Sequence, residues 1–218
     1  MRRSSLRSVL CLPVLGMLAA CGGLLTSREP APVTYVLRPV AASVAARAGG
    51  APSPTAASAA SSPVSLQVQR VVVAPGYARD EILLTHPDRR LDQYAASRWP
   101  DALPAVVERL AVDALRQHGA WSAVHDAAAP LPATQLLRLT VRRFDAEYAA
   151  AGRAPVVRVV IDATVARRDD RALLDSFTVE ASAQASEDRM SAIVAAFEQA
   201  AGEALDGIAS GAARSASR

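Results

Sequence analysis

The chain has 218 residues, of which 24 are Lys or Arg and 21 are Asp or Glu, and every one of the 24 is an arginine. The formal net charge of +3 comes from three arginines in residues 1–20, so the chain from residue 21 onward is formally neutral. A neutral domain lacks the basic surface with which proteins bind nucleic acid, and we expect no nucleic-acid partner. The length allows one domain of ordinary size with a real hydrophobic core.

Residues 1–20 have the layout of a secretory signal. Their arginines precede an apolar run over residues 9–18, which is too short to span a bilayer as a helix. The motif Leu18-Ala19-Ala20-Cys21 resembles the lipobox of bacterial lipoproteins, in which the signal is cut before a cysteine that becomes lipidated. We therefore expect the mature chain to begin at Cys21, to carry covalent lipid there and to need no other cofactor. The alternative is an ordinary signal cut near Ala20.

The residues around the lipobox also predict a location. Gly22 follows the cysteine, where an aspartate would resemble an inner-membrane retention signal. We therefore expect a lipid anchor in the outer membrane of a Gram-negative bacterium, on its periplasmic face. Cys11 would leave with the signal and Cys21 would carry the lipid, so the mature domain would have no thiol for catalysis, a disulfide or a metal site.

The mature chain begins with segments of weak pattern. Residues 21–32 are a polar, Gly-containing tether, and residues 33–38 resemble a short first strand. Residues 41–63 are rich in Ala, Ser and Pro without apolar periodicity, which predicts a mobile loop.

The pattern becomes stronger from residue 64 onward. Residues 64–74 are β-branched and apolar, which predicts a buried strand. Residues 81–85 and 91–94 are predicted to form a hairpin around the His86-Pro87-Asp88 turn.

A helix is predicted after the hairpin. Asp101 is a suitable N-cap, Pro104 falls in the first turn where its missing N–H costs least, and Gly119 is a suitable C-terminal stop. Apolar residues recur between them on one helical face, namely Leu103, Val106, Val107, Leu110, Ala114 and Leu115.

Three alternating patterns follow, over residues 136–144, 157–165 and 177–181, and they predict an antiparallel meander. Arg142-Arg143 marks a predicted bulge and Asp169-Asp170 a predicted turn.

The chain ends with its clearest amphipathic helix, over residues 190–208, and a small, polar tail over residues 210–218 that we expect to fray. Residues 33–209 are thus predicted to form a single α+β domain. Its mixed or antiparallel sheet would carry two amphipathic helices packed on one face.

No catalytic set stands out in the sequence. His86, His118 and His125 lack metal-ligand spacing to one another, and no G-x-S-x-G motif is present. We therefore expect neither a metal site nor an enzyme.

Aromatic residues are only 4% of the chain, yet several of them gather around the predicted hairpin. Aromatic side chains and arginines in loops are typical interface anchors. Six residues are therefore candidates for contact with a partner: Tyr77, Arg79, Ile82, Tyr94, Arg98 and Trp99. The alternative is structural, with Trp99 packed at the helix entry and Tyr77 covering the edge of the sheet.

These motifs together resemble the ABC-type transport auxiliary lipoproteins, the family to which paraquat-inducible protein C belongs. The resemblance rests on Tyr35-Val36-Leu37, on a P-x-Y-x-x-x-x-I pattern from Pro75 to Ile82, on Arg98-Trp99 and on the helix that follows. It covers nearly all of the mature chain. Ala78 departs from the family pattern, which more usually has leucine after the tyrosine.

The resemblance implies a role in transport. Such lipoproteins work with an inner-membrane ABC permease, its ATPase and a periplasmic MCE-domain protein, which together move phospholipids or other lipids between the two membranes. The chain would be the non-catalytic docking subunit at the outer membrane. Because MCE assemblies are ring-like, a symmetric homo-oligomer would match them.

Two other classes of protein stay open at this point. A structural or assembly lipoprotein, serving lipopolysaccharide export or peptidoglycan synthesis, would be distinguished by its neighbouring genes. An envelope hydrolase would show turnover that depends on a named carboxylate.

Overall fold

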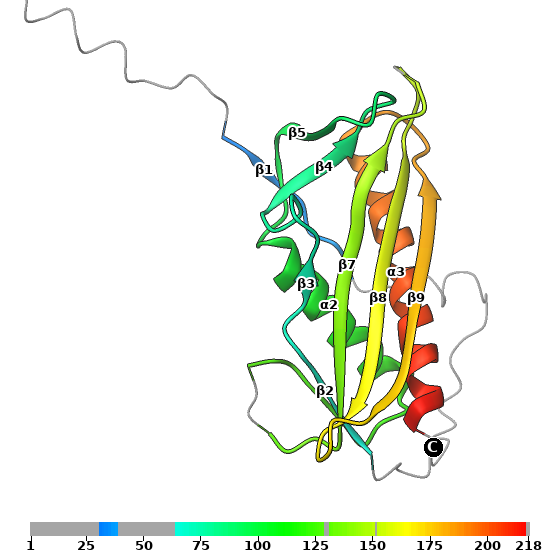
Figure 1. Cartoon of the computed structure of the whole chain (residues 1–218). Helices are drawn as coiled ribbons and strands as arrows, with labels where there is room; N and C mark the ends of the chain where they lie inside the picture. Colours follow the sequence, from blue (N-terminus) through cyan, green and yellow to red (C-terminus); the bar gives the residue numbers. More distant parts are fainter. Residues whose placement is uncertain (1–30, 39–63, 129–130, 151, 217–218) are drawn as a thin grey trace, which may run out of the picture. The chain divides into compact units, whose positions relative to one another are not determined.

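The computed structural model describes residues 31–38, 64–128, 131–150 and 152–216 (Figure 1). Residues from Pro32 onward form one unit, and the preceding residues form another. The predicted signal over residues 1–20, the lipidation site Cys21 and the predicted loop over residues 41–63 lie outside the described residues.

The strand β7 (Gln135–Glu147) is the centre of the sheet. On one side it pairs antiparallel with β8 (Val156–Arg167), which in turn pairs antiparallel with β9 (Leu173–Gln184). These pairings confirm the predicted meander. The register shifts between Val141 and Arg143, which confirms the bulge predicted at the arginine pair.

The other side of β7 is shared by three short strands, all parallel to it. β2 (Ser65–Val68) pairs with its first residues, β3 (Val72–Val73) with its middle and β4 (Glu81–Thr85) with its end. Figure 1 shows these three strands following one another along β7.

The single strand predicted over residues 64–74 is therefore wrong. Leu66, Val68 and Val71 are all buried. A strand alternates its side chains with a period of two, so one regular strand cannot turn all three residues to the core. The chain leaves the regular ladder between β2 and β3, which allows Val71 to reach the interior.

The sheet extends beyond these strands at both ends of β7. β5 (Leu91–Arg98) pairs antiparallel with β4, which confirms the predicted hairpin but makes its second strand longer than predicted. β1 (Val33–Thr34) pairs parallel with β5, and β6 (Ala123–His125) pairs parallel with β2. β1 is shorter than the predicted strand over residues 33–38, because Leu37 leaves the sheet and is buried beside the helices.

Two helices cover one face of the sheet, as predicted (Figure 1). α2 (Leu103–His118) ends at the predicted stop, Gly119, which has a left-handed φ of 73°. The N-cap prediction is wrong, because the N-cap is Ala102 and it makes no side-chain hydrogen bond. The Asp101 carboxylate accepts only the adjacent N–H of Ala102 (2.8 Å), so it does not reach into the first turn.

The second helix, α3 (Met190–Ala216), is longer than predicted. Gly211, Ala212 and Ser215 are buried within it, so the prediction of a frayed tail from residue 210 is wrong over the described residues. The physical reason is close packing: a Cβ added at Gly211 would lie 2.4 Å from Cζ of Phe177 on β9. The small residues that suggested fraying are what allow the helix to approach the sheet.

Aromatic side chains form the centre of the core. Trp99 contacts Phe144 and Phe197 edge to face, with ring centroids 6.2 and 5.3 Å apart, and the two phenylalanines stack at 5.2 Å. All three side chains are almost fully buried. The cluster joins β7 and α3 to the chain that enters α2, and it completes the predicted α+β fold.

Candidate functional site

The loop between β3 and β4 is fixed by its backbone. Gly76 has a φ of 94°, a left-handed value that favours glycine, and the following N–H of Tyr77 bonds the carbonyl of Ala74 (3.1 Å). The carbonyl of Arg79 accepts the N–H of Leu103 at the start of α2 (2.9 Å). The loop is thereby tied to the helix and keeps a defined course.

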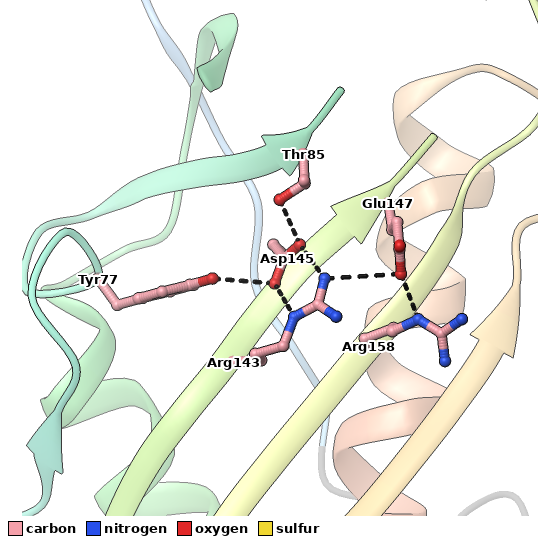
Figure 2. Close-up of polar contacts among 6 residues, drawn as sticks. All are labelled: Tyr77, Thr85, Arg143, Asp145, Glu147 and Arg158. Carbon is pink, nitrogen blue, oxygen red and sulfur yellow. Dashed lines mark hydrogen bonds and ion pairs between the residues drawn. The ribbon is translucent and has the colours of Figure 1, made fainter. Parts of the chain in front are cut away.

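A buried carboxylate, that of Asp145 on β7, lies beneath this loop. Tyr77 Oη donates to its Oδ1 (3.0 Å) and Thr85 Oγ1 donates to its Oδ2 (2.7 Å). Arg143 binds both oxygens, through Nε (3.2 Å) and Nη2 (2.9 Å). Because the carboxylate is fully buried, these donors replace the water it has lost. Figure 2 shows the four side chains converging from the loop, β4 and β7.

The same arginine continues the network across the sheet. Arg143 Nη2 lies 3.6 Å from Glu147 Oε2, and that oxygen also accepts Nε of Arg158 on β8 (Figure 2). The hydrogen bond to Asp145 raises the pKa of Arg143 above its ordinary value. We call these side chains, with Tyr77 and Thr85, the Asp145 network.

A second chain of hydroxyl groups joins β5 to the start of α3. Tyr94 Oη donates to Tyr148 Oη (3.0 Å), which donates to Asp188 Oδ1 (2.5 Å). Burial, followed by the bond to Asp188, raises the pKa of Tyr148 to about 12. Burial likewise raises the pKa values of Tyr77 and Tyr94.

The six predicted contact residues differ in exposure. Ile82 and Trp99 are 0% and 1% exposed, so the expectation that they contact a partner directly is wrong. Trp99 packs at the helix entry, which is the alternative stated above. Tyr77 and Tyr94 are half-buried, with their hydroxyl groups bonded inside the domain.

Arg79 and Arg98 are the exposed members of the set, with side chains 81% and 45% exposed. Arg79 lies 3.5 Å from the carboxylate of Glu81, and Arg98 lies 3.6 Å from that of Asp80. Glu81 and Arg98 are also neighbours in the β4–β5 ladder. We call these four residues the Arg79–Arg98 cluster.

Sequence reasoning missed the centre of this site. Asp145, Arg143, Thr85 and Tyr148 did not stand out, although all four bond the candidate tyrosines or their neighbours. The available signal was an aspartate between two apolar residues, Phe144 and Ala146, at the end of a predicted strand.

The described residues show neither a metal-binding cluster nor a membrane-spanning helix. Among them, no group of three or more His, Cys, Asp or Glu side chains is arranged to hold a metal ion. Nor does any helix in the described ranges combine the length and apolar character needed to cross a membrane. Asp145 and its donors hold the loop between β3 and β4 in place. The charged residues Arg79 and Asp80 belong to this loop.

Solved structures share this fold. Protein XCC0632 from Xanthomonas campestris is similar over 88% of this chain and 97% of its own, with a TM-score of 0.65 and 21% identity. An uncharacterized protein is similar over 69% of this chain and 92% of its own, with a TM-score of 0.58 and 18% identity. No curated protein matches the sequence.

The sequence of the chain also matches a protein family. The model of the ABC-type transport auxiliary lipoprotein component matches residues 50–209, which is most of the chain. The chain therefore belongs to this family, and the resemblance predicted from its motifs is confirmed.

Proposed function

We propose that this protein is a non-catalytic docking subunit of an ABC transport system that moves phospholipids or other lipids between membranes. Lipid on Cys21 anchors it to the periplasmic face of the outer membrane. Its partner is a periplasmic MCE-domain protein that works with an ABC permease and an ATPase. The observation that carries the proposal is the family match over residues 50–209, since it makes the chain an auxiliary component of ABC transport.

The docking surface in this proposal is the Arg79–Arg98 cluster. Its two arginine side chains are exposed, while the backbone beneath them is bonded to the start of α2 and to the residue after β5. The carbonyl of Arg79 accepts the N–H of Leu103 (2.9 Å), and the carbonyl of Asp80 accepts the N–H of Trp99 (2.7 Å). A surface that is rigid before binding loses less conformational entropy when a partner docks. Tyr77, which precedes the cluster in the same loop, is held by the bond from its hydroxyl group to the buried Asp145.

Photo-crosslinking in cells tests the proposal. A photoreactive amino acid at position 79 or 98 should capture the MCE-domain partner, whereas the same group at the exposed Glu203 of α3 should not. The double variant Arg79→Ala, Arg98→Ala should lose partner capture without a change in its free energy of unfolding, because exposed ion pairs contribute little to stability. Undiminished capture by the double variant would contradict the docking surface. Capture of an export or peptidoglycan-synthesis protein in its place would favour the assembly lipoprotein.

The anchor is tested separately. Cys21→Ser, combined with replacement of residues 1–20 by an ordinary cleavable secretory signal, should release the protein from outer-membrane fractions into the periplasm while the domain stays folded. A variant that remains in the outer membrane would contradict lipid anchoring at Cys21.

A further inference from the structure

The face of the meander opposite the helices carries several arginines. Three of them have carboxylate partners: Arg142 with Asp162 (3.8 Å), Arg143 with Asp145, and Arg158 with Glu147. These pairs largely cancel the positive charge over the upper part of this face.

The lower part of the same face differs in charge. A depression of about 400 Å³ lies there, over the ends of β7, β8 and β9 next to the turn between β8 and β9. Arg138 and Arg171 line it, and none of its lining residues is acidic. Within the described ranges, no carboxylate lies within ion-pair distance of either guanidinium. We call this depression the lower notch.

The environment of Arg138 holds its side chain without neutralising it. Its Nε donates to the amide oxygen of Gln69 (3.3 Å), a neutral acceptor. A guanidinium group has five N–H donors, so its terminal nitrogens keep donors for a further ligand. Two such groups at one depression suit an oxyanion such as phosphate, which arginine binds through paired hydrogen bonds.

The remaining lining of the notch is apolar. Leu173 is 64% exposed, and Leu136 and Ala166 are half-buried beside it. An exposed leucine next to cationic groups leaves apolar surface in water that a ligand could cover. A free phosphate ion would use only the arginines, whereas a molecule with an apolar chain next to its anionic group would use both parts of the lining.

We propose that the lower notch binds the headgroup of a phospholipid, with its phosphate on Arg138 and Arg171 and the adjoining apolar part of the molecule on Leu136 and Leu173. This proposal deepens the proposed role in lipid transport by naming a lipid site on this chain. It depends on residues different from those of the Arg79–Arg98 cluster, so the two proposals can fail independently.

The position of the notch distinguishes it from the docking surface. The notch adjoins the first residues of β7, and the β4–β5 hairpin adjoins the last. A strand rises about 3.3 Å per residue, so the two ends of β7 lie roughly 40 Å apart. A bound lipid would therefore lie at the end of the sheet away from the Arg79–Arg98 cluster.

Titration calorimetry on residues 21–218 carrying Cys21→Ser, which have neither the apolar signal nor the lipid, tests the proposal without detergent micelles. The probes are dodecyl phosphate, inorganic phosphate for the headgroup alone and dodecyl maltoside for the chain alone, with both dodecyl compounds below their micelle concentrations. Dodecyl phosphate should bind most tightly of the three. Arg138→Gln and Arg171→Gln should each weaken it about tenfold, and Leu173→Ser should weaken it severalfold. Arg90→Gln, an exposed arginine in the β4–β5 turn, is the matched control and should leave binding unchanged.

Three outcomes would overturn the proposal. Dodecyl phosphate could bind the double variant Arg138→Gln, Arg171→Gln as tightly as the parent, while circular dichroism shows both to be folded. Inorganic phosphate could bind as tightly as dodecyl phosphate, which would make the notch a site for a free anion. Dodecyl maltoside could bind as tightly as dodecyl phosphate, which would make it a purely apolar surface.

Discussion

At the scale of the residue, Asp145 shows how one buried charge can hold three segments together. Its carboxylate is fully buried and accepts hydrogen bonds from the loop residue Tyr77, from Thr85 of β4 and from Arg143 of β7 itself. Removing the carboxylate would leave two hydroxyl groups and a guanidinium without their main acceptor. Removing one partner of a buried pair lowers the free energy of unfolding by more than the pair contributes to it, because the other partner stays buried without a hydrogen bond.

We therefore expect Asp145→Ala to lower the free energy of unfolding by roughly 2–4 kcal/mol, measured by urea denaturation. Asp162→Ala is the control, because the Asp162 side chain is 39% exposed and its partners, Arg142 at 3.8 Å and the Thr178 hydroxyl at 2.7 Å, lie on the surface of the sheet. The control should change stability by less than about 1 kcal/mol. Equal stability of the two variants would contradict the structural role of Asp145.

The tyrosine chain makes a prediction about alkaline pH. The pKa of Tyr148 is about 12 in the folded protein, against an ordinary value of 10.0. Below pH 10 the group keeps its proton in both states, so its contribution to stability is complete. Between about pH 10 and 12 the unfolded chain loses the proton first, and the contribution falls. Urea denaturation at pH 8 to 11 should show declining stability, and Tyr94→Phe, Tyr148→Phe should reduce that decline. A parallel decline in the double variant would contradict this account.

Individual residues were the part of the site least predictable from sequence. The sequence singled out Arg79 and Arg98, which the structure connects through Glu81 and Asp80. It could not separate interface residues from core residues, because a tryptophan just after a strand, such as Trp99, occurs in both. Asp145 was missed because its two hydroxyl donors, Thr85 and Tyr77, are 60 and 68 residues away in the chain, and the nearby Arg143 alone does not indicate a buried carboxylate.

At the scale of the element, the contact between α3 and β9 depends on glycines. A Cβ at Gly207 would lie 2.9 Å from Cγ1 of Val179, and one at Gly211 would lie 2.4 Å from the ring of Phe177. Alanine is ordinarily the better helix former by about 1 kcal/mol. Here the added methyl group must push the helix or the strand aside, and overpacking a core costs roughly 1–3 kcal/mol.

We expect Gly211→Ala to destabilise the protein by about 1–2 kcal/mol in chemical denaturation, despite its gain in helix propensity. Gly207→Ala should have a smaller effect, because its closest contact is the end of a valine side chain. Phe177→Leu should partly rescue Gly211→Ala by removing the ring. A more stable Gly211→Ala protein would show that the helix tolerates a wider spacing from the sheet.

Elements with a strong period were predictable, whereas those set by distant contacts were not. The meander, the hairpin and both helices follow from alternation or helical periodicity. The break between β2 and β3 does not, because it depends on packing against β7, which is distant in the sequence. This packing leaves Val71 buried. The last turns of α3 were missed for a similar reason, since Gly211 has a packing role visible only when Phe177 is beside it.

At the scale of the whole molecule, the described part of the chain begins with a short segment held on the surface of the domain. The Tyr35 N–H bonds the carbonyl of Arg98 (2.8 Å), and Leu37 is 6% exposed beside both helices. Arg38 then bonds Glu198 of α3 through its backbone N–H (3.0 Å) and its Nε (3.1 Å). Residues 33–38 therefore belong to the folded domain.

A pair of truncations tests this boundary. A chain lacking residues 1–31 should unfold with the same free energy as a chain lacking residues 1–20. A chain lacking residues 1–38 should lose roughly 2–3 kcal/mol, chiefly because Leu37 no longer fills its place. Urea denaturation measures both values. Equal stability of all three chains would mean that this segment contributes nothing to the fold.

The central place of β7 has a consequence for the order of folding. β7, β8 and β9 are joined by short connections and can pair as soon as they are made, whereas β2, β3 and β4 pair with a strand far ahead in the chain. Closing such long loops is slow. During synthesis β2, β3 and β4 therefore cannot pair until β7 has been made. Until then, apolar residues such as Leu66 and Ile82 are exposed. We expect the chain to need protection by a chaperone until β7 has emerged.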